Sequence, residues 1–254
     1  IVDHREVYLL GSESSEVWTD VGAFPFPFQR IPGTSTQHGI AAPFSLSRLG
    51  NSFAYVSRNN RGQAQIMQMN GYKPERISTH AVENSLTNKY IDDAIAWTYQ
   101  LEGHEVYVVS FPTLELTWAY DSTTDMWHKW LYTTDKNEYQ RHRGNCCAVF
   151  QGLVIVGDYE NGNIYTFDLQ TYADNGSAQK WLRSWRALPT GTNNLKRTAQ
   201  HSLQLDCETG VGLVDGQGSD PQVMMRWSDD GGHTWSNEQW APMGKIGEYY
   251  RRVF

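Results

Sequence analysis

A repeat of about fifty residues constrains the fold of this chain more than any other feature of its sequence. An apolar run follows an Xaa-Gly turn at Gly50, Gly103 and Gly152, and these glycines stand 53 and 49 residues apart. The run 7–10 occupies the same position about one period earlier. Self-similarity at ~40 to 50 residues is typical of β-propellers, in which each repeat is a small sheet that buries its faces against its neighbours. The sequence therefore predicts four blades, the first without its leading strand.

Residues 94–130 show the repeat most completely. Short runs rich in β-branched and aromatic residues alternate with clusters of Gly, Pro, Asp and Ser, which is the pattern of strands joined by tight turns. We predict a meander of four antiparallel strands in this unit, at 94–100, 105–110, 116–121 and 126–130. The third strand recurs at 16–19, 65–69, 116–120 and 163–167, and the fourth at 28–31, 75–78, 127–132 and 181–185.

Composition agrees with an all-β fold made of such blades. Aromatic residues make up 13% of the 254 residues and include 10 Trp, and we expect most Trp and Tyr to pack between blades. Hydrophobic residues are 39%, and no uninterrupted apolar run approaches the ~18 residues that a membrane helix needs. We therefore predict no membrane insertion.

The repeat is lost after residue 191. We predict two domains, with about four propeller blades in 1–191 and a further β-rich segment in 192–254. In the second domain, strands are expected at 197–206 and 223–227. We also expect the chain to be an internal fragment of a longer protein that continues past residue 254.

The most specific local pattern is Ser-x-Asp-x-Gly-x-Thr-Trp, which predicts an Asp-box hairpin. Ser and Asp side chains bond the nearby backbone to close such a turn, glycine supplies a positive φ, and Trp packs under the loop. This chemistry is structural, not catalytic. The predicted Asp-box residues are Ser228, Asp230, Gly232, Thr234 and Trp235.

An alternating Phe-Pro stretch is a candidate contact with a partner protein. Proline lacks a backbone donor, so the stretch cannot be a central strand. Three phenylalanines on an extended segment suit a pocket on a neighbouring protein, and burial in their own blade is the alternative. The three residues are Phe24, Phe26 and Phe28.

Patterns that carry catalysis or bind metals are scarce. The 8 His residues show no His-x-x-x-His spacing, the 3 Cys show no Cys-x-x-Cys, and we expect them to be reduced thiols. Carboxylates at predicted turns could supply the acid and base of a glycoside hydrolase, but charged turns more often serve solubility. We predict no enzymatic activity, no cofactor and no metal. The carboxylate pairs are Asp92 with Asp93, Glu102 with Glu105, and Asp158 with Glu160.

The net charge of −7 argues against a surface that grips nucleic-acid phosphate throughout. Short basic clusters lie next to aromatic residues, and we expect them to serve interfaces or salt bridges at the rim. The clusters are Arg141–Arg143; Lys180, Arg183 and Arg186; and Lys196–Arg197.

One family shares this combination of features. The long aromatic repeat, together with Met225–Ser236, Gly244, Gly247–Tyr249 and Arg251–Phe254, resembles the tail-hub proteins of short-tailed bacteriophages. These podovirus tail accessory factors are also called packaged-DNA stabilisation proteins. The resemblance spans the whole chain and is most specific over 225–254.

The resemblance implies a structural protein of the virion that is assembled in the host cytoplasm. Family members form a hexameric nozzle below the portal and its adaptor, retain packaged DNA, and anchor the tail needle and tailspikes. Double-stranded DNA would pass through the channel without sequence-specific binding. The alternative is a carbohydrate-binding or sialidase-like β-propeller, in which exposed Trp side chains stack on sugars.

Overall fold

The computed structural model describes every residue except 4, 60, 135–137, 170, 172, 186–198 and 217. The chain divides into two compact units, Ile1–Lys180 and Trp181–Phe254. The predicted boundary between residues 191 and 192 lies outside the described residues and stays a prediction.

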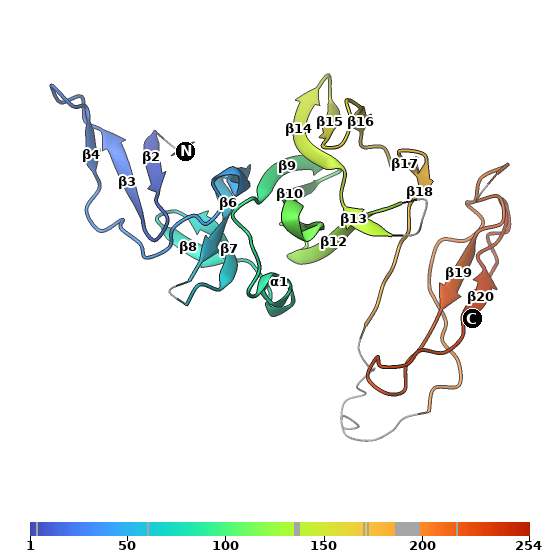
Figure 1. Ribbon diagram of the computed structural model, residues 1–254. Coiled ribbons are helices and arrows are strands. Elements are labelled where there is room, and N and C mark those ends of the chain that lie inside the picture. Colours follow the sequence, from blue (N-terminus) through green and yellow to red (C-terminus); the bar gives the residue numbers. More distant parts are fainter. Residues whose placement is uncertain are drawn as a thin grey trace. The chain divides into compact units, whose positions relative to one another are not determined.

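The first unit contains four antiparallel meanders in series (Figure 1). Sheet one is β1 (Val2–Asp3), β2 (Glu6–Leu10), β3 (Ser15–Asp20) and β4 (Phe28–Arg30). Sheet two is β5 (Ser47–Leu49), β6 (Ser52–Arg58), β7 (Ala64–Asn70) and β8 (Lys73–Arg76). Sheet three is β9 (Ile95–Leu101), β10 (His104–Phe111), β11 (Leu116–Asp121), β12 (Met126–Thr133) and β13 (Tyr139–Arg141). Sheet four is β14 (Gly144–Phe150), β15 (Leu153–Asp158) and β16 (Ile164–Thr166).

The predicted period is confirmed, because each recurring apolar run forms the second strand of a sheet. Two details of the prediction are wrong. Sheet one has a leading strand, β1, which the sequence pattern misses because it is only two residues long. The fourth strand expected at 181–185 does not form among these described residues.

A local hairpin explains the missing fourth strand. Shortly after β16 the chain turns through β17 (Ala173–Asp174) and β18 (Ser177–Ala178), which pair with each other. Their turn is Asn175-Gly176, with φ of 49° and 84°. Two positive φ values define the type I′ turn that Asn-Gly favours, so local pairing replaces a return to sheet four.

Alternation along the middle strands makes consecutive sheets stack. In β6, Phe53 and Tyr55 pack against sheet one, whereas Val56, on the other face, packs against sheet three. In β10, Tyr107 faces sheet two and Val108 faces sheet four. Successive side chains of a strand point to opposite faces, so a strand that is apolar at every position can be buried on both sides.

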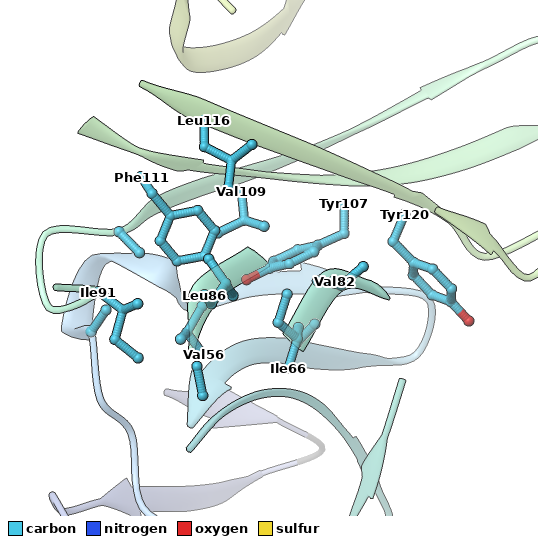
Figure 2. Close-up of a cluster of buried hydrophobic side chains, with 14 of the residues drawn as sticks. Val56, Ile66, Val82, Leu86, Ile91, Tyr107, Val109, Phe111, Leu116 and Tyr120 are labelled. Carbon is cyan, nitrogen blue, oxygen red and sulfur yellow. The ribbon is translucent and has the colours of Figure 1, made fainter. Parts of the chain in front are cut away.

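The core between sheets two and three is the largest of the three cores (Figure 2). A short helix that the sequence pattern did not predict, α1 (His80–Leu86), contributes Val82 and Leu86 to it. The indole Nε1 of Trp118 donates to Ser85 Oγ at 3.1 Å and ties the helix to β11. The labelled members of this core are Val56, Ile66, Val82, Leu86, Ile91, Tyr107, Val109, Phe111, Leu116 and Tyr120.

Two 3-10 turns connect strands of the first unit, η1 (Pro43–Ser45) and η2 (Pro112–Leu114). Buried polar groups of η1 are paired. The Tyr107 hydroxyl donates to the Ser45 carbonyl at 2.7 Å, and the Ser45 hydroxyl accepts the Val56 amide at 2.9 Å. These bonds satisfy groups whose desolvation would otherwise cost stability.

The second unit contains one hairpin among its described residues, β19 (Gln222–Met225) with β20 (Gln239–Pro242). The strand expected at 223–227 is therefore confirmed within two residues. The strand expected at 197–206 forms only an isolated bridge, Leu205 with Val253, in its described part. In the described part of the chain, no helix has the length and apolar character to cross a membrane.

Two phenylalanines distinguish core packing from surface exposure. Phe111 is fully buried in the core between sheets two and three, so Phe111→Ala should lower the free energy of unfolding by about 3 to 5 kcal/mol. Phe44 is 76% exposed, so Phe44→Ala should change it by less than about 0.5 kcal/mol. Urea unfolding followed by Trp fluorescence measures both. Equal losses in the two variants would contradict the assignment of this core.

Candidate functional site

The Phe-Pro stretch forms an exposed loop between β3 and β4. The Val21 amide donates to the Pro27 carbonyl at 2.8 Å, and the Gly22 amide donates to Asp20 Oδ1 at 2.8 Å, which closes the base of the loop.

The three phenylalanines that were predicted to contact a partner differ in how they pack against the rest of the protein. Phe26 packs edge-on against Trp18, with ring centroids 6.1 Å apart, and lies 5.8 Å from Phe28. Phe24 is 98% exposed. The structure thus brings Phe26 and Phe28 together and leaves Phe24 in solvent, so burial of Phe24 in its own blade is wrong.

The residues of the predicted Asp-box lie in the connection between β19 and β20. Asp230 accepts the Thr234 amide at 2.8 Å through Oδ1 and the Thr234 hydroxyl at 2.6 Å through Oδ2. The Ser228 hydroxyl donates to Asp230 at 2.7 Å and accepts the Gly232 amide at 2.8 Å. The hydrogen bonds from Thr234 and Ser228 hold the pKa of Asp230 at about 2.

Glycine and tryptophan complete this turn. Gly232 has a φ of 95°, a region that side-chain-bearing residues rarely adopt. The Trp235 indole Nε1 donates to the Gly232 carbonyl at 3.2 Å, and the ring stays half exposed. All five predicted residues are thus assembled in one turn whose bonds are internal. That this turn is an Asp-box remains a proposal.

An aromatic cluster joins sheets three and four. Tyr99 meets Phe167 edge-on with centroids 4.9 Å apart, and Trp130 lies 5.0 Å from His142. Trp97 completes the cluster and is 5% exposed. Burial among these rings lowers the pKa of His142 to about 4, because a cation is poorly solvated there. The expectation that Trp and Tyr pack between blades is met here.

One basic cluster serves the interior, not an interface. Arg143 pairs with Asp158 at 3.4 Å and also with Glu160, and Arg141 lies 3.7 Å from the centre of the Tyr159 ring. Both arginines are buried, so of the two expected roles Arg143 takes that of a salt bridge, and neither side chain is exposed for an interface. Of the other basic residues, Arg186, Lys196 and Arg197 lie outside the described residues.

The carboxylates considered for acid and base chemistry mostly bind the scaffold. Asp92 pairs with Arg58, and Asp93 accepts the Thr113 amide at 2.7 Å. Glu105 accepts the Gly50 amide at 2.7 Å and so links the turns of sheets two and three. Each of these bonds engages one oxygen of its carboxylate in holding the scaffold.

Within the described ranges, no group of three or more His, Cys, Asp or Glu side chains could hold a metal ion. Cys146, Cys147 and Cys207 are free thiols, as predicted.

Both units match models of one known protein family. Residues 1–172 match the model described as "Bacteriophage P22 Gp10, beta-propeller", and residues 180–254 match "Bacteriophage P22 Gp10, beta-sandwich". No curated protein gives a significant match. These matches identify a structural protein of a bacteriophage tail.

The chain belongs to the bacteriophage P22 Gp10 family. The resemblance to the tail accessory proteins of short-tailed phages is confirmed across the chain, as is the all-β fold with propeller blades. Membership in a family of phage tail structural proteins places the protein in the virion. It does not favour the carbohydrate-active alternative.

Asp230 should stabilise its turn, whereas the adjacent Asp229 should not. Asp230→Ala removes both acceptors of Thr234, so the amide hydrogen of Thr234 should exchange several-fold faster, because a hydrogen-bonded amide exchanges more slowly than a free one. Asp229→Ala is the matched control and should leave that rate unchanged. Exchange followed by NMR or mass spectrometry measures the difference. Unchanged exchange in Asp230→Ala would contradict a structural role for this carboxylate.

Stability should fall in mildly acidic solution because of His142. The unfolded chain protonates this imidazole near pH 6.5, but the folded chain does so only near pH 4. The unfolded state therefore binds more protons between these values, and stability that is complete above pH 6.5 is lost as pH falls towards 4. The loss should reach about 3 kcal/mol.

The urea midpoint measured from pH 7.5 to 4.0 tests this dependence. His142→Gln should flatten the profile in this window, whereas His233→Gln, on the exposed turn of the second unit, should leave it unchanged. A profile that is equally steep in His142→Gln would show that other groups cause it.

Proposed function

We propose that this protein forms the tail hub of a short-tailed phage, a nozzle below the portal and its adaptor. In this role it oligomerises as a hexameric ring, retains packaged DNA, and anchors the tail needle and tailspikes. Assembly takes place in the host cytoplasm. The observation that carries the proposal is the match of both units, over 1–172 and 180–254, to one phage tail family.

The packing of the first unit supports a mechanical role. β6 and β10 are buried on both faces, so each inner sheet is held from two sides. Deforming such a stack would open tightly packed cores, which is costly because protein interiors are close-packed. A rigid wall suits a conduit that must withstand the pressure of packaged DNA.

Charge supports passage of DNA without tight binding. The first unit contains 13 Lys and Arg and 20 Asp and Glu residues, a balance of 13 − 20 = −7. Each phosphate neutralised by a cation releases counterions and strengthens binding. An acidic or neutral bore would instead let the duplex slide during ejection.

The exposed Phe-Pro loop supports protein partners. Apolar side chains at full exposure gain free energy when a partner covers them, and about 2 kcal/mol is a typical gain for one phenylalanine. Phe24 stands out from a loop braced by Phe26 and Trp18, which suits insertion into a pocket on the adaptor or a neighbouring subunit.

The assembly itself tests the proposed function. Full-length protein mixed with the portal adaptor should sediment as ring-shaped oligomers that are visible in negative stain. A protein that stays monomeric at every concentration, with the adaptor present, would contradict the hub.

Phe24 should matter for assembly and not for folding. Phe24→Ser should weaken adaptor binding by about tenfold, a loss of about 1.4 kcal/mol, because truncating an anchor residue typically costs more than 1 kcal/mol. The melting temperature should not change, since the side chain is in solvent. Phe44→Ser, at the second most exposed phenylalanine of the described residues, is the control and should bind normally. Equal binding by both variants would argue against the loop as a contact.

A further inference from the structure

Residues 249–252, here called the Tyr-Arg surface, form an exposed aromatic and basic stretch of the second unit. Tyr249 is 70% exposed and Tyr250 is 81% exposed, and Arg251 and Arg252 are also exposed. In the part of the chain that the structure describes, neither arginine forms an ion pair. Tyr and Arg are enriched at the energetic centres of protein interfaces, because each combines a large contact area with polar bonding groups.

The backbone under this surface is fixed in place. The Leu205 amide donates to the Val253 carbonyl at 3.1 Å, and Val253 itself is buried. The Thr209 hydroxyl donates to the Tyr249 carbonyl at 3.2 Å, and the Gly247 amide donates to the Gly210 carbonyl at 3.0 Å. A segment held in this way loses little entropy on binding, which favours affinity.

Gly210 is required for this arrangement. Its φ is 77°, and a Cβ at this position would lie 2.8 Å from the backbone carbon of Glu248. The chain can therefore approach residues 248–249 closely only with glycine at position 210.

A hollow of about 380 Å³ lies beside the two arginines. Its charged lining consists of Arg251, Arg252 and Asp206, so one positive charge remains uncompensated. The hollow can therefore receive a side chain that carries a carboxylate.

The charge of the whole chain favours a protein occupant over DNA. The second unit contains 8 Lys and Arg and 8 Asp and Glu residues, a balance of 8 − 8 = 0, so the net −7 resides in the first unit. A chain of this charge repels a polyanion, and two arginines would neutralise only about two phosphates. The same charge attracts these arginines to the first unit of another copy.

The first unit has an acidic rim with exposed carboxylates. Glu102 lies in the β9–β10 turn and Asp125 in the β11–β12 turn, and both residues are exposed. The Thr123 hydroxyl donates to the Gly103 carbonyl at 3.1 Å and holds the two turns together. Glu102 and Asp125 are called the acidic rim here.

We propose that the Tyr-Arg surface of one copy binds the acidic rim, Glu102 and Asp125, on the first unit of a second copy. The contact joins different surfaces on the two copies, and such head-to-tail contacts generate rings when the rotation closes. The inference rests on the proposed hub function, for which it identifies the subunit contact.

Charge reversal tests the contact. Arg251→Glu/Arg252→Glu in the full chain should weaken self-association by at least tenfold in sedimentation velocity at ~50 mM salt, where surface charges are poorly screened. Arg61→Glu/Lys89→Glu makes the same change of charge at two exposed residues of the first unit and should associate normally. Near-UV circular dichroism should show that both variants are folded.

A charge swap tests the partner surface. Glu102→Arg should weaken association by itself, and combining it with Arg251→Glu should restore at least part of the loss. Failure of the swap to restore association would overturn the acidic rim as the partner.

The remaining outcomes separate this contact from the hub function. If Arg251→Glu/Arg252→Glu associates as well as the wild type, the proposed contact is wrong, but the proposed hub function is not contradicted. If this variant associates normally but no longer binds a 30-base-pair duplex, the Tyr-Arg surface binds DNA, and the proposed contact between copies is wrong. If the wild-type protein stays monomeric even with the adaptor, both the proposed hub function and the proposed contact are wrong.

Discussion

The burial of β6 and β10 on both faces is the interaction on which the rest of the first unit depends. Phe53 and Tyr55 complete one core while Val56 completes the next, so a single strand couples three sheets. Tyr107 and Val108 repeat this arrangement in β10. Because every buried face needs a matching neighbour, the sheets can only follow one another in a stack. Loops, turns and charges are then displayed along rims whose positions the stack determines.

Much of this architecture could be predicted from the sequence, because burial on both faces requires a continuous apolar run, and such runs recur after Gly50, Gly103 and Gly152. Two features could not be predicted, because each depends on which of several possible local structures the chain adopts. The Asn175-Gly176 hairpin took the chain away from sheet four, although Trp181 and Trp185 suggested a strand. The helix α1 was missed because its seven residues are too few to show a helical period, and it is stabilised by the core that it enters.

The candidate surfaces show the same division between local and long-range information. The turn around Asp230 could be predicted, because Ser228 and Thr234 bond it from within the motif. Proline's missing donor predicted that Phe24 lies outside a central strand, but it left open whether the side chain is buried or exposed. Arg143 could not be placed, because Asp158 and the Tyr132 ring, which lies 4.3 Å from its guanidinium, approach it from separate strands. A basic residue in a sequence shows its charge but not its counterion.

The unequal distribution of charge connects the fold to assembly. In the proposed hub, a net −7 confined to the first unit would repel a passing duplex, and it would repel the first unit of another copy as well. Close association of such subunits therefore needs cations at the contact, and exposed arginines meet this need because the guanidinium binds carboxylates in a fixed, bidentate geometry. Acidic walls with a few unpaired arginines on the neutral unit can thus combine a bore that releases DNA with subunits that hold one another.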